Sequence, residues 1–339
     1  MMFTDLSWSI AFFLSLIAVL FASDRLVYAV EAAGDRYSWT PGLVGLLAAA
    51  GADGPEVSAA IIALGAGAHD ISLGVIVGSN LFNLAAVLAF PILLVGFVAV
   101  QRRGLLLNGG AMVLTTLLAA GIITGTIPLA LGELLVLATL LAYAVLLVRS
   151  RESVPARPST LPNVIEQDAG NIEEEERARE READIEQGFP SGVTLLWRGG
   201  LATAVIIGGC DVLVHATLYL GPRLGIPATF TGTFALAALT SLPNVWVATS
   251  LARRHRGAVL VSAVCNSNTI NMVAGICLPA LFATFKATGV VRNLDIPALV
   301  VLTLVSVALI WRNRGIGRYG AAVLVAGYMV FAIARIRLS

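Results

Sequence analysis

Charged residues are scarce in this sequence, where they make up 13% of 339 residues and include a single lysine. Soluble domains carry about 25% charged residues, so a water-soluble globular protein is excluded. The net charge of +1 leaves no basic surface of the kind that binds nucleic acid. The three cysteines, Cys210, Cys265 and Cys277, are isolated in apolar stretches without C-x-x-C spacing, which argues against a disulfide framework or a zinc site.

Apolar residues dominate instead, at 58% of the chain with a mean hydropathy of +0.87, and they predict an integral membrane protein. Ten of the 21 acidic residues fall between positions 166 and 186, which leaves 11 for the rest of the chain. A charge at the centre of a membrane helix costs about 2.5 to 3.5 kcal/mol. The few acids inside apolar stretches are therefore the candidates for function.

The apolar stretches predict an all-α polytopic membrane protein, because a spanning helix needs about 20 mainly apolar residues. Ten spans are expected: 8–30, 42–66, 71–99, 105–125, 127–148, 194–220, 228–252, 257–285, 296–311 and 319–336. The N-terminus lacks a basic region before its apolar run, so we interpret it as the first span and not as a cleaved signal peptide.

A polar segment at 149–193 separates residues 1–148, with five spans, from residues 194–339, with the other five. Its acidic composition is typical of a solvated linker, and a regulatory segment is the alternative. It contains no EF-hand pattern.

Arginines set the predicted orientation. One side carries Arg102, Arg103, Arg149, Arg151, Arg157, Arg253, Arg254, Arg256, Arg312, Arg314 and Arg318; the other carries only Arg223, Lys286, Arg292, Arg335 and Arg337. The positive-inside rule assigns the richer side to the cytoplasm. We therefore expect a multi-pass protein of the plasma (inner) membrane with both termini outside and the acidic linker in the cytoplasm.

The two halves resemble each other in sequence. Asp24 aligns with Asp211 at an offset of 187, and after a one-residue slip the aligned pairs are Pro55 with Pro243, Ser79 with Ser267, Asn80 with Asn268 and Asn83 with Asn271. Since each half holds an odd number of spans, the second half must enter the membrane from the opposite side. Such inverted five-helix repeats place the substrate site of transporters near the midplane, where the repeats meet.

The second span is interrupted by the run Gly51, Ala52, Asp53, Gly54, Pro55, Glu56. Proline removes one backbone donor and leaves the carbonyl of Gly51 without its helical partner. Broken backbone at membrane depth is tolerated where it lines a cavity or is buried in protein. Free carbonyls beside carboxylates are ligands for hard cations, and Asp53 and Glu56 share one helix face.

The seventh span repeats the pattern with neutral residues, since Pro243 frees the carbonyl of Leu239 and the neighbouring side chains are Thr240, Ser241 and Asn244. The third and eighth spans add Ser79, Asn80, Asn83, Ser267, Asn268 and Asn271. Four segments rich in oxygen donors predict a cation site. The alternative is that the prolines only kink helices and the asparagines hydrogen-bond between helices.

Asp24 and Asp211 are weaker candidates for the site, because Asp24 adjoins Arg25 and the two can form a structural ion pair. Glu133, His215 and the His69–Asp70 pair carry weaker signals still. We expect His69 and Asp70 in a short extracellular connection and His215 in an interhelical hydrogen bond.

The segments GADGPEVSAAI with VGSNLFN, and LTSLPNVWVAT with CNSNTIN, resemble the two alpha repeats of the sodium/calcium exchanger (calcium/cation antiporter) superfamily. The corresponding regions are about 42–99 and 228–285. The resemblance implies ten helices, one cation site at mid-membrane, and ion ligands at Glu56, Asn80, Thr240, Ser241 and Asn268, with Asn244 at the place of the second repeat's glutamate.

Three departures from the family pattern matter. Asn244 replaces a glutamate, Asp53 stands where serine is usual with Ala52 in place of threonine, and Asn266 stands where glycine is usual. The two negative charges are therefore gathered on one helix, where they repel each other. We hypothesise that the pair shares a proton when no ion is bound, which would make protons a coupling ion.

The predicted function is a secondary-active antiporter that exchanges calcium or sodium for sodium or protons by alternating access. No ATP-binding motif or resident cofactor is expected, and the expected partners are the lipid bilayer and inorganic cations. One alternative is a transport-inactive family member that acts as a cation sensor or a structural protein. A remote alternative is an intramembrane aspartyl protease built on Asp24 and Asp211, although SDRL and CDVL do not match its motifs.

Overall fold

The structure is a computed structural model of the chain and describes residues 2–37, 47, 49–149, 191–226, 230–253, 257–285 and 287–338. Within these ranges, eight helices are long and apolar enough to cross a membrane, and two shorter apolar helices, Gly54–Gly65 and Gly232–Ser241, fall in the two remaining predicted spans. The chain is therefore a mostly helical membrane protein. Most of the predicted linker, 150–190, and the stretches 42–46 and 227–229 lie outside the described residues.

Helices account for nearly all the described elements, because a helix satisfies its backbone hydrogen bonds internally at membrane depth. The first half contains α1 (Met2–Tyr37), α3 (Gly54–Gly65), α4 (His69–Phe82), η1 (Asn83–Leu88), α5 (Ala89–Val95), β1 (Phe97–Ala99), α6 (Arg102–Gly104), η2 (Leu105–Gly109), α7 (Gly110–Thr124) and α8 (Leu129–Arg149). The second half contains α10 (Gly192–Arg223), η3 (Thr231–Leu236), α12 (Ala237–Arg253), α13 (Gly257–Met272), η4 (Val273–Cys277), α14 (Leu278–Ala280), η5 (Val291–Asp295), α15 (Ile296–Asn313), β2 (Gly315–Gly317) and α16 (Arg318–Leu338).

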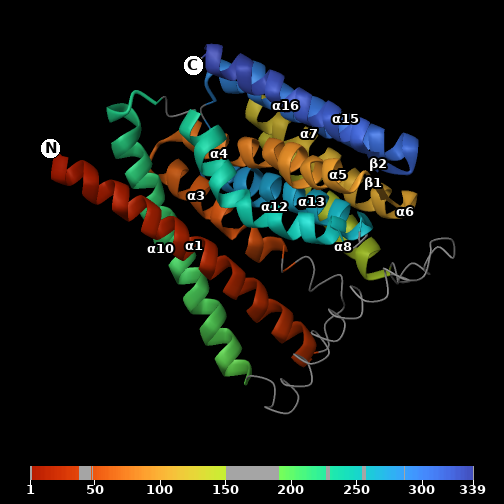
Figure 1. Cartoon of the computed structure of the whole chain (residues 1–339), viewed down its shortest axis with the longest axis horizontal. Helices are drawn as coiled ribbons and strands as arrows, with labels where there is room; N and C mark the ends of the chain where they lie inside the picture. Colours follow the sequence, from red (N-terminus) through yellow and green to blue (C-terminus); the bar gives the residue numbers. More distant parts are fainter. Residues whose placement is uncertain are drawn as a thin grey trace.

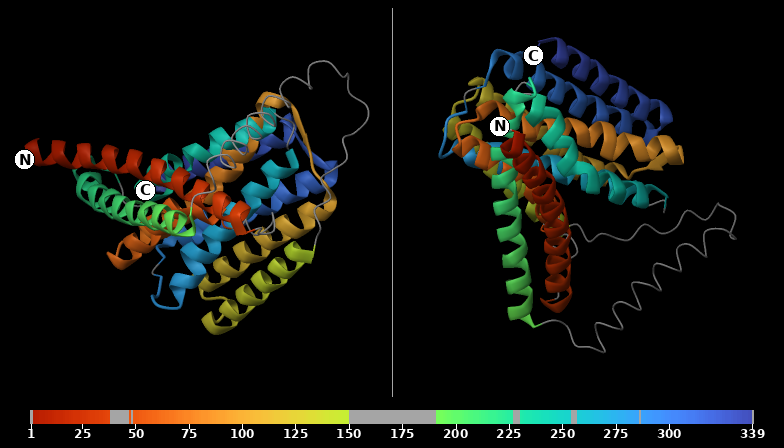
Figure 2. Two further views of the ribbon diagram at one scale, coloured as in Figure 1. Left: turned by 90° about the horizontal axis from the view of Figure 1, so that it is seen from below. Right: turned by 60° about the vertical axis from the view of Figure 1, so that its left-hand side comes forward.

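The long helices α1 and α10 pack side by side in opposite directions and form a pair beside the other helices (Figure 1). One end of this pair is tied by an Asp5–Arg223 ion pair of 3.3 Å and by the rings of Trp8 and Tyr219, whose centroids are 5.6 Å apart. The other end projects beyond the remaining helices (Figure 2). Along its length the pair contacts α3 and α12, so it borders the two spans that carry the proline motifs.

The remaining helices form a bundle with α4, η1 and α5 at its centre. Helix α4 packs closely on η3 through Gly78, where a Cβ atom would lie 2.2 Å from the carbonyl oxygen of Thr233. Helix α13 contacts α4, η1 and α12. The predicted polar segments of the third, seventh and eighth spans therefore meet in the interior of the bundle. The structure puts His69 and Asp70 in the first turn of α4, not in a connection between helices.

A short antiparallel ladder joins the two halves, with Phe97 opposite Gly317, Val98 opposite Ile316 and Ala99 opposite Gly315. The prediction of one continuous span over 71–99 was wrong at its end, because the helix stops at Gly96, which has a positive φ of 96°. Glycine is required at 315, since a Cβ atom there would lie 2.3 Å from the carbonyl oxygen of Val98.

Five described segments are π-helical, and four of them form two pairs at corresponding places in the two halves. η1 begins at Asn83, and η4 begins two residues after Asn271, the residue aligned with Asn83. η2 leads into α7, and η5 leads into α15. Because π-turns are uncommon and concentrate at functional sites, their occurrence beside the asparagine motifs marks this part of the bundle.

Candidate functional site

The second span breaks where the sequence predicts. The backbone makes a turn at Asp53, and α3 starts anew at Gly54 with Pro55 in its first turn. Proline is tolerated there because the first N–H groups of a helix have no intrahelical acceptor. Asp53 and Glu56 flank this start, and each is only 1% exposed. The break therefore presents two carboxyl groups to the interior of the bundle.

Each carboxyl group is held by one serine from the other half of the chain. The Ser267 hydroxyl donates to Asp53 Oδ1 at 2.7 Å, and the Ser241 hydroxyl donates to Glu56 Oε1 at 2.9 Å. The second oxygens, Asp53 Oδ2 and Glu56 Oε2, are buried and have no hydrogen-bond partner among the described residues. Each carboxyl group is thus fixed through one oxygen and has the other available.

Asn244 and Thr240 complete the surroundings of the carboxyl groups. The Asn244 side chain interacts with Asp53, and the Thr240 side chain interacts with Glu56. Position 53 aligns with 241 and position 56 with 244, so the contacts between α3 and α12 cross, from 53 to 244 and from 56 to 241. The single hydroxyl hydrogen of Thr240 is donated to the carbonyl of Leu236 at 2.9 Å.

The asparagines of α4 and η1 bond reciprocally to those of α13. Asn80 donates to the carbonyl of Asn268 at 3.1 Å, and Asn268 donates to the carbonyl of Asn80 at 3.2 Å. Asn83 donates to Asn268 Oδ1 at 2.9 Å, and Asn271 donates to Asn80 Oδ1 at 3.0 Å. The interhelical bonding considered above is therefore present, and it fixes the amides without using every oxygen.

Asn83 also joins this amide network to the carboxyl groups, because it donates to Ser267 at 3.0 Å. Within the motifs of the second, third and eighth spans, five buried oxygens have no hydrogen-bond partner in the described chain: Asp53 Oδ2, Glu56 Oε2, Ser79 Oγ, Asn83 Oδ1 and Asn271 Oδ1. Two charged and three neutral oxygens of this kind are ligands that hard cations prefer. Among the described residues no group of three or more His, Cys, Asp or Glu side chains comes together, so the site has no set of the zinc type.

The carbonyl of Gly51, predicted to be free, accepts a hydrogen bond from Ser23 of α1 at 3.1 Å. Ser23 also donates to the carbonyl of Ala52 at 3.3 Å, and Cys210 of α10 donates to the carbonyl of Pro55 at 3.4 Å. Ser23 was not among the predicted site residues. The available signal was its alignment with Cys210, one position before the Asp24–Asp211 match.

The second predicted break differs from the first. Helix α12 continues from Ala237 to Arg253 through position 243, so the prediction of a second break was wrong. Proline in a helix interior removes one hydrogen bond, which leaves the Leu239 carbonyl short of its usual donor, and neighbouring helices can support such a helix without an interruption. The side chain of Pro243 lies outside what the structure describes.

The structure does not bring Asp211 into the site. Its side chain is 57% exposed on α10 and lies 3.3 Å from Nδ1 of His215 on the same helix. The same nitrogen lies 2.9 Å from the Asp211 carbonyl, so among the described residues His215 bonds within its own helix and not between helices as expected. The Asp24 side chain lies outside the described residues. Gly209 packs against Val19, and Gly199 lies beside Leu26, so positions 24 and 211 stand at different levels of the pair.

Two further polar groups lie away from the carboxyl groups. Asn266, which stands where the family has glycine, accepts a hydrogen bond from Tyr143 of α8. Arg335 of α16 pairs with Asp295 at 2.9 Å, with both side chains 1% exposed. The prediction that Arg335 is one of the outer arginines did not anticipate this burial, which is possible because the carboxylate accompanies the guanidinium.

Comparisons with known proteins show the family of the chain. A family model described as sodium/calcium exchanger protein matches residues 7–151 and 194–337. The chain is 26% identical over 329 residues to the inner membrane protein YrbG of Escherichia coli (strain K12), with 94% of this chain and 93% of that protein covered. It is 28% identical over 149 residues to the sodium/calcium exchanger MaX1 of Methanosarcina acetivorans, with 44% and 42% covered.

Solved structures share the fold. The H+/Ca2+ exchanger CAX superposes with a TM-score of 0.68 at 16% identity, over 98% of this chain and 86% of that one. The sodium-calcium exchanger NCX_Mj superposes with a TM-score of 0.61 at 21% identity, over 97% and 99%.

Proposed function

The chain belongs to the sodium/calcium exchanger family, and from this premise we propose that it is a secondary-active antiporter that exchanges calcium or sodium for sodium or protons. The observation that carries the proposal is the arrangement of Asp53 and Glu56. Both carboxyl groups are buried at a helix break, each is held by a serine through one oxygen, and each keeps the other oxygen available. Carboxylates at membrane depth are costly, which favours a role in binding ions.

The charge of the site limits what it can bind. Two carboxylates supply two negative charges, which one divalent cation neutralises and one monovalent cation does not. The second charge can then be balanced by a second monovalent ion or by a proton shared between Asp53 and Glu56. This charge count supports exchange of a divalent ion against monovalent ions or protons at a single site.

We further propose that the chain has ten spans in two inverted repeats. The crossed contacts between α3 and α12 and the reciprocal bonds between α4 and α13 relate aligned positions of the two halves, as a two-fold axis within the membrane plane requires. The paired π-segments support the same relation. With five spans in each half, both termini lie on one side of the membrane and the linker on the other, and the arginine distribution assigns the linker to the cytoplasmic side of an inner-membrane protein.

In this mechanism, α1 and α10 move against the bundle. Their polar contacts with the backbone of the broken span are those of Ser23 with Gly51 and Ala52 and that of Cys210 with Pro55. A cation that uses the Gly51 carbonyl draws on the same oxygen as the Ser23 hydroxyl and weakens that hydrogen bond. Ion binding at the break and contact between the pair and the bundle therefore compete, which couples occupancy to the position of α1.

Flux measurements in proteoliposomes test the antiporter proposal. Purified protein is reconstituted and supplied with gradients of calcium, sodium, potassium or protons, and uptake is followed for the wild type and for Asp53→Asn. We expect exchange of a cation in the wild type and its loss in the variant. Equal flux in both would remove the Asp53 carboxyl group from the mechanism, and flux that neither moves protons nor depends on pH would remove the shared proton.

Asn244 favours one alternative, a family member that binds cations without transporting them, because the second repeat contributes no carboxylate. Such a protein would act as a sensor or a structural component. A cation-dependent rise in melting temperature combined with no flux under any of the four gradients would support this alternative.

A further inference from the structure

An apolar groove with a volume of about 400 Å³ lies between two helices of different halves. One wall comes from η2 and α7 and includes Gly110 and Leu114, and the other comes from α15 and includes Leu304 and Trp311. All its lining residues are apolar or glycine. From Leu105 to Leu114 the groove follows roughly 13 Å of helix, and none of its residues belongs to the cation site.

Four exposed arginines gather at one end of this groove. Arg102 stacks over the ring of Trp311 with its Cζ atom 5.0 Å from the ring centroid, and Arg103, Arg312 and Arg314 are its neighbours in sequence or across the ladder. The register of the ladder explains their proximity, because Ala99 lies opposite Gly315 and the N–H of Val100 donates to the carbonyl of Arg314 at 3.0 Å. Arg102 and Arg103 follow β1, and Arg312 and Arg314 precede β2, so both pairs lie at the same end of the ladder.

These positive charges have no counter-charge within the described chain, where no acidic side chain pairs with any of the four. Like charges held together at the edge of an apolar region repel one another, and an anion relieves that repulsion. Guanidinium groups bind phosphate oxygens through paired N–H donors. The arginine distribution predicts that this end of the bundle faces the cytoplasm. On that side of a membrane, basic pockets between helices bind the headgroups of anionic lipids.

We infer that the groove between α7 and α15 binds an anionic phospholipid, with an acyl chain along the apolar walls and the headgroup phosphate at Arg102, Arg103, Arg312 and Arg314. The apolar acyl chain of such a lipid matches the apolar walls of the groove, and its anionic headgroup matches the arginines at the end of the groove. A zwitterionic lipid fits less well, because its own ammonium group opposes the arginines. The bound lipid would hold the two halves of the chain together at a point remote from the carboxyl groups.

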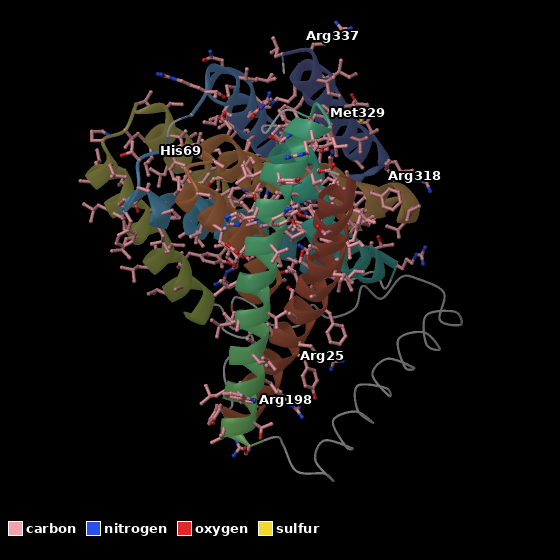
Figure 3. All side chains as sticks on the ribbon, turned by 90° about the vertical axis from the view of Figure 1, so that its left-hand side faces the viewer. Arg25, His69, Arg198, Arg318, Met329 and Arg337 are labelled. Carbon is pink, nitrogen blue, oxygen red and sulfur yellow. The ribbon has the colours of Figure 1, made fainter. Side chains whose placement is uncertain are left out.

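Lipid binding to the full-length protein in detergent, followed by native mass spectrometry, tests this site. Phosphatidylglycerol is titrated against the wild type, Arg102→Gln/Arg312→Gln and Gly110→Leu, with phosphatidylcholine and free glycerol phosphate as comparison ligands. Leucine at 110 fills the groove without a clash at its root, because no atom lies within 4 Å of a Cβ there. Arg198→Gln is the matched control, since Arg198 is also exposed but lies on the projecting part of α10 (Figure 3).

Each interfacial arginine contributes about fivefold in affinity for an anionic lipid, so the double variant should bind phosphatidylglycerol about 25-fold more weakly. Gly110→Leu should bind at least tenfold more weakly, and Arg198→Gln should bind within twofold of the wild type. Melting temperatures measured alongside report whether each variant is folded. An unchanged affinity in both groove variants, an equal loss in Arg198→Gln, or equal binding of free glycerol phosphate would overturn the inference.

The acidic segment of the linker is the competing occupant, because its ten acids at 166–186 also complement arginines. A variant with Glu173, Glu174, Glu175 and Glu176 replaced by glutamine separates the two. We expect this variant to bind phosphatidylglycerol as the wild type does. Binding that appears only after the four glutamates are replaced would assign the arginines to the linker and overturn the lipid site.

Discussion

Replacing Glu56 by glutamine tests the geometry of the proposed site directly, because glutamine keeps the shape of the side chain and removes its charge. Ser241 donates to Glu56 Oε1 at 2.9 Å, and a glutamine carbonyl oxygen can accept the same bond. The amide nitrogen must then occupy the place of Oε2, the oxygen that has no partner in the described chain. The variant therefore loses a charge and also presents N–H donors where a cation needs an oxygen.

The expected loss of cation affinity follows from the burial of the Glu56 carboxylate together with the positive charge of the bound cation. Removing one partner from a buried pair of opposite charges costs about 3 to 5 kcal/mol. Since 1.4 kcal/mol corresponds to a factor of ten, the dissociation constant of the transported cation should rise roughly 100- to 4,000-fold. The fold should survive, because the Ser241 contact is retained and a buried carboxylate without a bound ion is itself unfavourable.

Calorimetric titration of calcium and sodium into the purified variant measures this change, and flux in proteoliposomes should fall with it. Glu133→Gln is the control, because Glu133 is also a carboxyl group within a predicted span but lies on α8, outside the set of residues around the break. If Glu56→Gln binds both ions within threefold of the wild type, Glu56 is not an ion ligand and the proposed site is wrong.

Three further predictions concern charge, ion pairing and packing. Asn244→Glu restores a carboxylate to the second repeat beside Asp53, so competition assays should show calcium favoured over sodium by at least tenfold more than in the wild type. Unchanged selectivity would contradict the idea that gathering both charges on one helix sets the choice of ion. Arg335→Met leaves the buried Asp295 carboxylate without its counter-charge and should lower the free energy of unfolding by about 3 to 5 kcal/mol. Adding Asp295→Leu to the same chain should recover most of this loss in thermal unfolding. Additive losses in the double variant would argue against the ion pair. Gly78→Ala should cost about 1 to 3 kcal/mol and lower the melting temperature in detergent, because its Cβ would meet the Thr233 carbonyl. Gly110→Ala has open space around its Cβ and should stabilise the helix by up to about 1 kcal/mol, since alanine is the better helix former. Equal stability of the two variants would refute the close packing of α4 on η3.

The sequence was informative where composition and local chemistry decide the structure. Long apolar runs predict spanning helices because the bilayer excludes other backbone conformations, and eight such helices are present in the described chain. The break at Asp53 follows from Gly54 and Pro55, which act locally. The alignment of the two halves brought Asn80 and Asn268 together as candidates, and the structure has them bonded to each other.

Features that depend on packing between distant segments could not be read from the sequence. The ladder of three residues on each side is too short to carry a strand pattern, and its partners are more than 200 positions apart. The burial of Arg335 depends on Asp295, 40 positions away, and the bond from Ser23 to Gly51 depends on how α1 packs on the break. Position 243 shows that a local signal can also predict too much. Proline coincides with a helix break at Pro55, whereas α12 continues through Pro243 without one.

The placement of both carboxyl groups on one broken helix has a consequence for the two faces of the membrane. When inverted repeats exchange their conformations, a symmetric site would offer the same environment to ions arriving from either side. Here the start of α3 carries Glu56 with Asp53 directly before it, whereas α12 offers Ser241 and Asn244 at the aligned positions. Under the proposed alternating access, the inward-open and outward-open forms would therefore be unequal in energy, and ions would bind with different affinity from the two compartments. Such a transporter rectifies, running faster in one direction under equal and opposite gradients.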